Sequence, residues 1–290
     1  MKNFIALFLL IVFPLTTFAS NELSYYPETF RQQYTNQTVA SEALKNNLFI
    51  ILTGLHARNS AGDIIVTNCI GQMECYSQIA LEYDEAKRNL FGKLHLKQDS
   101  QGYYVEDLYC QRKIRKTKAP YVQVGPMQIP DKEINCEHTW PQSKFTKSFS
   151  EKMQKGDLHH LYPVNIEANS TRGNYPFGSD PEVIGEHTAY QQLDNLNNCD
   201  SSRMLQIAKE GQFFEPPASH RGNVARSLFY FSVRYKLSIS ETQEKFLRLW
   251  NSEDPIDAEE LNRNNQVFEI QKNRNPFVDF PDLTDKITNF

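Results

Sequence analysis

This 290-residue sequence has no net positive charge and no internal repeats, and its one long apolar run lies at the N-terminus. Beyond residue 19, no stretch approaches the ~20 apolar residues of a membrane-spanning helix, which excludes a helical membrane protein. No repeat, heptad or low-complexity segment is found, so the sequence lacks the pattern of a solenoid or a coiled coil. Lys and Arg number 31 against 35 Asp and Glu. Any contact with nucleic acid therefore needs a local basic face.

The first 19 residues have the pattern of a cleavable signal peptide. Lys2 supplies a positive start, ten apolar residues run from Phe4 to Phe13, and Thr17 and Ala19 put small residues where a signal peptidase reads. We expect cleavage after Ala19 and a mature exported protein, residues 20–290, that is secreted or periplasmic and leaves the membrane. No cysteine follows the apolar run, so a lipid anchor is not expected.

The five cysteines predict disulfide bonds in an exported chain, with at least one thiol left over. Sequence does not choose among the pairings, and any one cysteine is equally well explained as a small buried side chain. Cys69 and Cys75 are close enough to close a small loop, so we prefer that pair. Cys136 precedes a candidate active-site residue, and a bridge there would stiffen its strand. The remaining two are Cys110 and Cys199.

The pattern of apolar residues predicts a mixture of helices and short strands. We expect helices over 38–56 and 79–90 and strands over 64–66 and 103–109. Residues 111–131 are basic and then contain proline, which predicts a surface segment. Its cations have a simpler explanation as a solvated face; they are Arg112, Lys113, Arg115, Lys116 and Lys118.

The C-terminal third is predicted to be mainly helical. Asn223 can cap a helix through Tyr235 that is apolar around much of its girth, which is typical of a core helix. Two further helix starts have the spacing of capping boxes: Ser240 with Gln243, and Asp257 with Glu260. We therefore expect one mixed α+β domain that is largely helical.

One window, residues 134–178, concentrates the chemistry. Three of the seven histidines lie there beside carboxylates and amides. Residues 133–138 predict a strand that Pro141 stops, residues 157–163 predict a second strand ending at Pro163, and residues 165–174 predict a short helix broken at Gly173. The window thus reads strand, loop, strand, helix, with His and Glu on one element and Asn on another.

These residues resemble the bacterial endonuclease I family, whose active site is a ββα-metal (His-Me) finger. The resemblance is weak before about residue 75, strong after about 130, and specific because several spaced motifs occur in order. The matching motifs are Glu137-His138 with Trp140-Pro141, residues 157–163, residues 169–174 with Pro176-Phe177-Gly178, residues 222–226 and 230–235, and residues 271–279. The implied fold is a single mixed α+β domain built around a ββα-metal core at about 133–178.

The resemblance implies an exported, divalent-metal-dependent, sequence-nonspecific endonuclease that cuts DNA, and by expectation RNA, leaving 5′-phosphate ends. It implies that His138 is the general base and that Glu137 and Asn169 hold Mg²⁺, with Mn²⁺ or Ca²⁺ as alternatives. Histidine suits the base because its ordinary pKa of about 6.5 lies near working pH, and a hard cation prefers oxygen ligands. We expect a monomer with no protein partner.

Neighbouring residues on a regular strand point to opposite faces, so Glu137 and His138 can share a site only if the strand ends or bulges at His138. His159 and His160 are also expected on opposite faces of their strand. One of the two is a candidate to orient the His138 site or contact phosphate, and a structural role is an equal alternative for each.

The residue that clamps the phosphate is less clear from the sequence. Relatives can place an arginine between the two strands, but residues 139–156 contain only lysines, and a lysine cannot make a bidentate contact. Arg172 is the next candidate for supporting transition-state charge. Lys144, Lys147 and Arg226 are candidate nucleic-acid contacts. Arg274 and Asn275 match a family motif but are better explained as caps that close the C-terminus.

Two other classes of function compete with a nuclease. One is a protein that has this fold and binds nucleic acid without cutting it; the complete set of Glu137, His138 and Asn169 argues against that alternative. Alternatively, Cys136, His138 and one of His159 and His160 could form a structural zinc site, but no C-x₂-C or H-x₃-H spacing is present.

Overall fold

The computed structural model describes residues 22–290 apart from 40, 116–122, 131–132, 194–195 and 197–198. The predicted signal peptide, residues 1–19, and two cations of the basic run, Lys116 and Lys118, lie outside the described residues.

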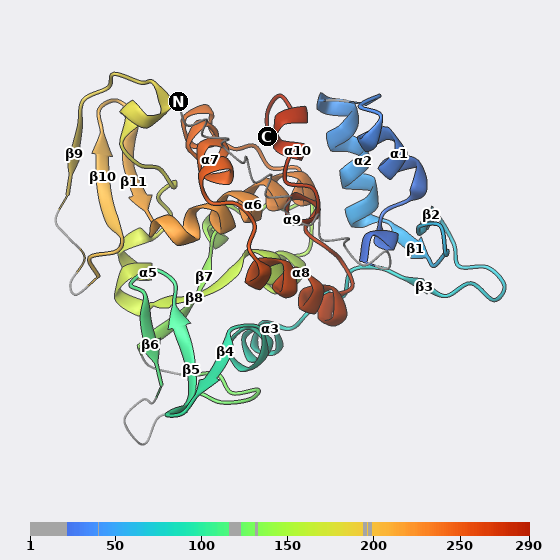
Figure 1. Cartoon of the computed structure of the whole chain (residues 1–290), viewed down its shortest axis with the longest axis horizontal. Coiled ribbons are helices and arrows are strands. Elements are labelled where there is room, and N and C mark those ends of the chain that lie inside the picture. Colours follow the sequence, from blue (N-terminus) through green and yellow to red (C-terminus); the bar gives the residue numbers. More distant parts are fainter. Residues whose placement is uncertain (1–21, 40, 116–122, 131–132, 194–195, 197–198) are drawn as a thin grey trace, which may run out of the picture.

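The strands form small antiparallel sheets around a central group of helices (Figure 1). In the described part of the chain, the strand orders are β2-β1-β3, β4-β5-β6, β7-β8 and β11-β10-β9. The strands are β1 Leu55–Ala57, β2 Ile64–Val66, β3 Cys75–Tyr76, β4 Leu96–Asp99, β5 Gly102–Asp107, β6 Arg112–Ile114, β7 Ile134–His138, β8 Leu161–Asn165, β9 Tyr190–Gln192, β10 Arg203–Ile207 and β11 Gly211–Glu215.

Helices supply most of the ordered structure. The α-helices are α1 Glu28–Thr35, α2 Ser41–Thr53, α3 Tyr83–Asn89, α4 Glu151–Lys155, α5 Ile166–Arg172, α6 Ala218–Tyr235, α7 Glu241–Glu253, α8 Ala258–Gln271, α9 Pro276–Asp279 and α10 Leu283–Lys286. Short 3₁₀ turns are η1 Glu22–Tyr25, η3 Gln142–Lys144, η4 Leu158–His160 and η5 Pro181–Ile184, and a π turn, η2 Leu90–Leu94, continues α3.

Helix α6 forms the centre of the core. It runs through the middle of the molecule, with α1 and α2 on one side and the β9–β11 sheet on the other (Figure 1). Its side chains are buried from Val224 through Tyr235 without interruption, so it is enclosed on all sides, and most of these side chains are apolar. The expected core helix is confirmed, but it begins at Ala218, where Pro217 is the N-cap, and Asn223 lies inside it. Proline just before the first turn suits a helix start because its φ is already fixed.

The disulfides are Cys69–Cys75 and Cys110–Cys199, and Cys136 is a buried free thiol. The preferred pairing of Cys69 with Cys75 is confirmed. The second bridge joins residues 89 apart in the sequence, a separation that only the fold could reveal.

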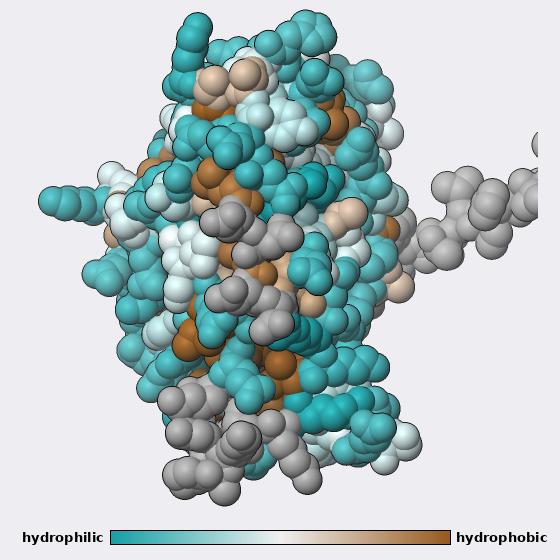
Figure 2. Space-filling view, turned by 90° about the vertical axis from the view of Figure 1, so that its left-hand side faces the viewer, coloured by the Kyte–Doolittle hydropathy of each residue, from teal (hydrophilic) through white to brown (hydrophobic). Residues whose placement is uncertain are grey.

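The surface is mainly hydrophilic on the side that carries the β9–β11 sheet, where apolar residues show only in small, separate areas (Figure 2). Among the helices of the described residues, none is both long enough and apolar enough to cross a membrane. The expected fold class, mixed α+β with a large helical share, is confirmed.

Candidate active site

The expected strand–strand–helix unit is present, with one error in its second strand. β7 pairs antiparallel with β8, and α5 follows β8 directly. Residues 158–160 form a 3₁₀ turn, and the strand comes later, at 161–165, with Pro163 inside it. The prediction of a strand over 157–163 was therefore wrong. The cause is local: the Asp157 carboxylate accepts a hydrogen bond from the His159 N–H (3.1 Å), which favours a turn over a strand.

β7 ends at His138, which is what Glu137 and His138 need in order to share one site. Glu137 is opposite Tyr162, and His138 is opposite Leu161 at the end of the ladder. Both side chains line the same cleft of about 340 Å³, and Asn169 from α5 lines it as well. The three residues that the sequence placed in one site are thus brought together.

The ring of His138 is held in one orientation. Its Nε2 lies 3.1 Å from the carbonyl oxygen of Lys155; because a carbonyl can only accept, Nε2 must carry the proton of the neutral ring. Nδ1 then has the lone pair, and its neighbour is the amide of Gln142 at 3.3 Å. Burial, and then the neighbouring His160, hold the pKa of His138 well below its ordinary value. At neutral pH, His138 is therefore an unprotonated base with Nδ1 as its basic atom.

Glu137 is a buried carboxylate supported on one oxygen. Its Oε1 accepts a hydrogen bond from the Tyr109 hydroxyl at 2.9 Å and pairs with Arg172 Nη1 at 3.0 Å. Oε2 takes part in neither contact. Burial raises the pKa of Glu137, while Arg172 and the Tyr109 hydrogen bond act to lower it. A cation bound at Oε2 would stabilise the ionised form further.

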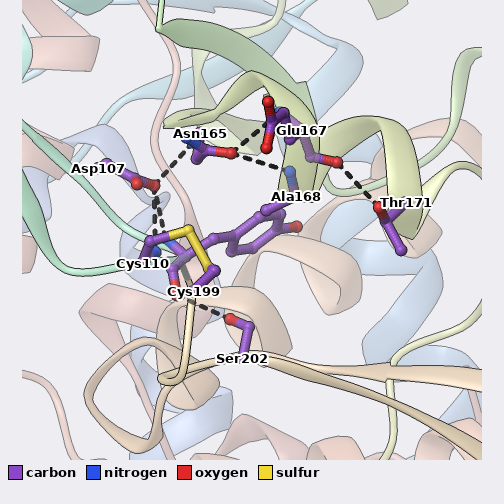
Figure 3. The surroundings of a disulfide bond; sticks show 9 residues. Asp107, Cys110, Asn165, Glu167, Ala168, Thr171, Cys199 and Ser202 are labelled. Atoms are coloured by element: carbon purple, nitrogen blue, oxygen red, sulfur yellow. Dashed lines mark hydrogen bonds between the residues drawn. A yellow bond between two sulfur atoms is a disulfide. The ribbon is translucent and has the colours of Figure 1, made fainter. Parts of the chain in front are cut away.

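The turn after β5 supports both sides of the site. The Asp107 carboxylate accepts hydrogen bonds from the N–H groups of Tyr109, Cys110 and Asn165 (Figure 3). Asn165 caps α5, the helix that carries Asn169, by accepting from two of its N–H groups. The Cys110–Cys199 disulfide ties the same turn to the segment before β10.

The residues of the cleft fit a hard divalent cation. Asn169 is half-buried, and in the described part of the chain no hydrogen bond occupies its side-chain amide. Together with Oε2 of Glu137 it offers two oxygen donors, which leaves most of a coordination sphere to water and phosphate, as Mg²⁺ favours. Among the described residues, no group of three or more His, Cys, Asp or Glu could hold a metal ion. The zinc alternative built on Cys136 and His138 was therefore wrong.

Arg172 lies in the site, but its guanidinium is already engaged. Nη1 donates to the His138 carbonyl at 3.1 Å, and Nη2 donates to the Thr139 carbonyl at 2.7 Å. Nη1 also pairs with Glu137, and both side chains of that pair are 2% exposed. Arg172 thus holds the end of β7 and the Glu137 carboxylate in place. Its Nε is buried without a hydrogen-bond partner among the described residues.

Three candidate nucleic-acid contacts are enclosed in the core, so these assignments were wrong. His159 Nε2 lies 3.1 Å from the Asn273 carbonyl, and His160 Nε2 lies 2.8 Å from the Gln154 carbonyl. Burial lowers the pKa of each of these two histidines to about 4. Arg226 is fully buried on α6 and makes a two-pronged ion pair with Glu260 (2.7 and 2.5 Å). Phosphate cannot reach any of them without disruption of the core.

The two lysine candidates are exposed, and they differ in position. Lys144 lies in a pocket that adjoins the cleft, whereas Lys147 lines neither. Sequence analysis also missed Tyr83 of α3, which lines the cleft with its ring 5.5 Å from that of His138. The ammonium groups of Lys87 and Lys155 lie 4.6 and 4.8 Å from the Tyr83 ring. Nothing in the local sequence marks Tyr83 or Tyr109, because each reaches the site through the fold.

Comparisons with known proteins identify a family. The sequence model of the family described as Endonuclease I matches residues 71–282. The chain is 32% identical over 176 residues to a protein named extracellular ribonuclease from Bacillus amyloliquefaciens, which covers 53% of each chain. It is 28% identical over 165 residues to an extracellular deoxyribonuclease from Aeromonas hydrophila, covering 57% of this chain and 66% of that one. It is 26% identical over 214 residues to endonuclease-1 from Buchnera aphidicola subsp. Acyrthosiphon pisum, covering 73% and 74%. The match with the Bacillus protein thus spans about half of that relative's length.

Proposed function

The chain belongs to the endonuclease I family, and on that premise we propose that it is an exported, divalent-metal-dependent endonuclease. It hydrolyses phosphodiester bonds of DNA and RNA without sequence specificity and leaves 5′-phosphate ends. The observation that carries the proposal is the meeting of Glu137, His138 and Asn169 in one cleft, with the lone pair of His138 fixed on Nδ1.

The chemistry follows from the donors in the cleft. When bound by Glu137 and Asn169, a divalent cation would stabilise negative charge on the phosphate and on the departing 3′ oxygen. His138 Nδ1 accepts a proton from a water molecule as the water oxygen bonds to phosphorus. The bond between phosphorus and the 3′ oxygen breaks, and the 3′ oxygen takes a proton from solvent water and leaves as a hydroxyl, while the protonated His138 returns its proton to solvent. The phosphate remains on the 5′ carbon of the next nucleotide.

The choice of substrates rests on relatives and on the kind of contact available. One relative is named a ribonuclease and another a deoxyribonuclease, so both nucleic acids are proposed. Contacts to phosphate carry no base information, which accounts for the absence of sequence specificity. Export is supported by the two disulfides, which persist in oxidising compartments, and by relatives named extracellular or periplasmic.

The test is cleavage of supercoiled plasmid and of a single-stranded RNA by the purified mature protein. We expect nicking followed by complete degradation with Mg²⁺, and no cleavage with EDTA or with His138→Ala. The products should accept label from a kinase only after phosphatase treatment, because their 5′ ends are phosphorylated. Activity that survives His138→Ala would remove the base assignment.

The same purified protein also tests the alternative function, in which the chain binds nucleic acid but does not cut it. If the wild type is inert with Mg²⁺, Mn²⁺ and Ca²⁺ but still shifts DNA on a native gel, binding alone is its function. In that case the family resemblance marks only the fold.

A further inference from the structure

A second pocket of about 210 Å³ adjoins the catalytic cleft. The two have Pro141 and Arg172 in common, so they are neighbours on the molecule. The pocket lies between the turn after β7 and the start of α7, and Lys144, Ser240 and Gln243 line it with the two shared residues.

The charged side chains that line the pocket are cations, one of which is paired with Glu137 behind the wall. Two cations, Lys144 and Arg172, line it, and none of the described residues in its wall is an aspartate or a glutamate. Lys144 makes no ion pair with the described residues. Burial, and then the charge of Arg172, hold the pKa of Lys144 below its ordinary value. An anion bound in the pocket would interact favourably with both cations.

Residues of the pocket wall have hydrogen-bonding groups without partners among the described residues. Arg172 is 2% exposed, and its Nε is buried with no partner among the described residues. Ser240 is the N-cap of α7 but makes no side-chain capping hydrogen bond. The capping box predicted for Ser240 and Gln243 is therefore not formed, and both side chains line the pocket instead. The first turn of this 13-residue helix is left with N–H groups that the predicted cap does not satisfy.

We propose that this pocket is a subsite for a backbone phosphate of the substrate, one linkage away from the phosphate that is cut. The inference rests on the proposed nuclease function and deepens it. Lys144 and the start of α7 would hold this neighbouring phosphate and fix the position of the strand in the cleft, with the charge of the buried Arg172 behind them. Because Arg172 is buried and holds Glu137, whereas Lys144 is exposed, Lys144 is the residue to test.

The experiment uses end-labelled single-stranded oligonucleotides with one neutral methylphosphonate linkage at a known position, cut by the wild-type mature protein with Mg²⁺. Cleavage sites are read at nucleotide resolution against an all-phosphodiester control. We expect suppressed cleavage at the modified linkage itself and at one neighbouring linkage, on one side only. Suppression at the neighbour should be roughly 10- to 100-fold, as for loss of a charged hydrogen bond.

Lys144→Gln and Lys147→Gln form a matched pair, because each removes one exposed charge from the same segment. In Lys144→Gln, cleavage of the unmodified strand should fall by a similar factor, and the extra suppression at the neighbour should disappear. In Lys147→Gln the suppression should remain as in the wild type. Equal thermal unfolding of the two variants would confirm that neither loses structure.

Three results would overturn the subsite. Neighbour suppression could be absent, it could persist in Lys144→Gln, or it could disappear equally in Lys147→Gln. A further measurement uses inorganic phosphate as an inhibitor of cleavage. If it inhibits the wild type but not Lys144→Gln while the neutral linkage has no effect on its neighbours, the pocket binds a free anion and is not a strand subsite. Failure of the wild type to cut any oligonucleotide would instead be a failure of the proposed function.

Discussion

Two histidine sites lie side by side in this protein and have different surroundings. The rings of His138 and His160 are 5.2 Å apart. His138 ends a strand and lines a cleft, where Nδ1 meets only a glutamine amide. His160 and His159 belong to a 3₁₀ turn beneath α6 and are enclosed by protein. All three rings are buried and use Nε2 on a backbone carbonyl.

The comparison separates chemistry from packing. Burial and one fixed nitrogen are common to all three histidines, so neither property marks a catalytic base. What distinguishes His138 is a second nitrogen that borders a cleft shared with Glu137 and Asn169. The enclosed pair instead adjoins Asp157, whose carboxylate accepts from Tyr230, Tyr235, Gln78 and Gln271.

The largest expected effect is on catalysis at the cleft. His138→Ala should lower the cleavage rate about 10²- to 10⁴-fold, the usual contribution of a general base, while the free energy of unfolding falls by only about 1–2 kcal/mol. Single-turnover cleavage and urea unfolding measure the two quantities. A loss of activity accompanied by global unfolding would mean that His138 belongs with the structural histidines.

The opposite pattern is expected for the enclosed site. Asp157→Ala leaves two tyrosine hydroxyls and two glutamine amides without their buried acceptor, so the free energy of unfolding should fall by about 3–4 kcal/mol. Below the unfolding transition the cleavage rate should change little. A large rate loss in the folded variant would contradict the separation of the two sites.

Acid should destabilise the enclosed site. Burial lowers the pKa of His159 and His160 from 6.5 to about 4. Between these values the unfolded chain binds more protons than the folded protein, so the free energy of unfolding falls as the pH decreases from 6.5 to 4. The side chain of His160→Gln can still donate to the Gln154 carbonyl, but it cannot take up a proton on unfolding. Between pH 6.5 and 4 the free energy of unfolding of this variant should therefore fall by roughly 2–3 kcal/mol less than that of the wild type. Parallel curves for variant and wild type would contradict the assignment.

The smallest effect is expected from Tyr109, which does not line the cleft and acts on it only through Glu137. Tyr109→Phe removes one hydrogen bond to Glu137 Oε1, and loss of about 1 kcal/mol of support should weaken binding of Mn²⁺ roughly fivefold. Calorimetric titration of Mn²⁺ into the metal-free protein measures this without catalysis. Unchanged Mn²⁺ affinity would show that Arg172 alone positions the carboxylate.

Local patterns in the sequence were sufficient to find the elements of the site but not their surroundings. The first strand, its end at His138 and the helix that stops at Gly173 follow from proline, glycine and apolar spacing. The second strand was misplaced because the turn that Asp157 begins competes with a strand over the same residues. The capping box at Ser240 was correctly located as a helix start, yet its side chains face a pocket that no local pattern describes.

The sequence by itself predicted the mixed α+β class, favoured the Cys69–Cys75 loop and singled out Glu137, His138 and Asn169 as site candidates, because each inference depends on residues close together in the chain or on spaced motifs. Only the tertiary structure decided that His159, His160 and Arg226 are buried, that Arg172 holds Glu137, and that Tyr109 and Cys110–Cys199 support the site. The physical reason is that burial and partner choice depend on which distant segments pack together. In this protein α6 covers one histidine pair and leaves the third beside a cleft.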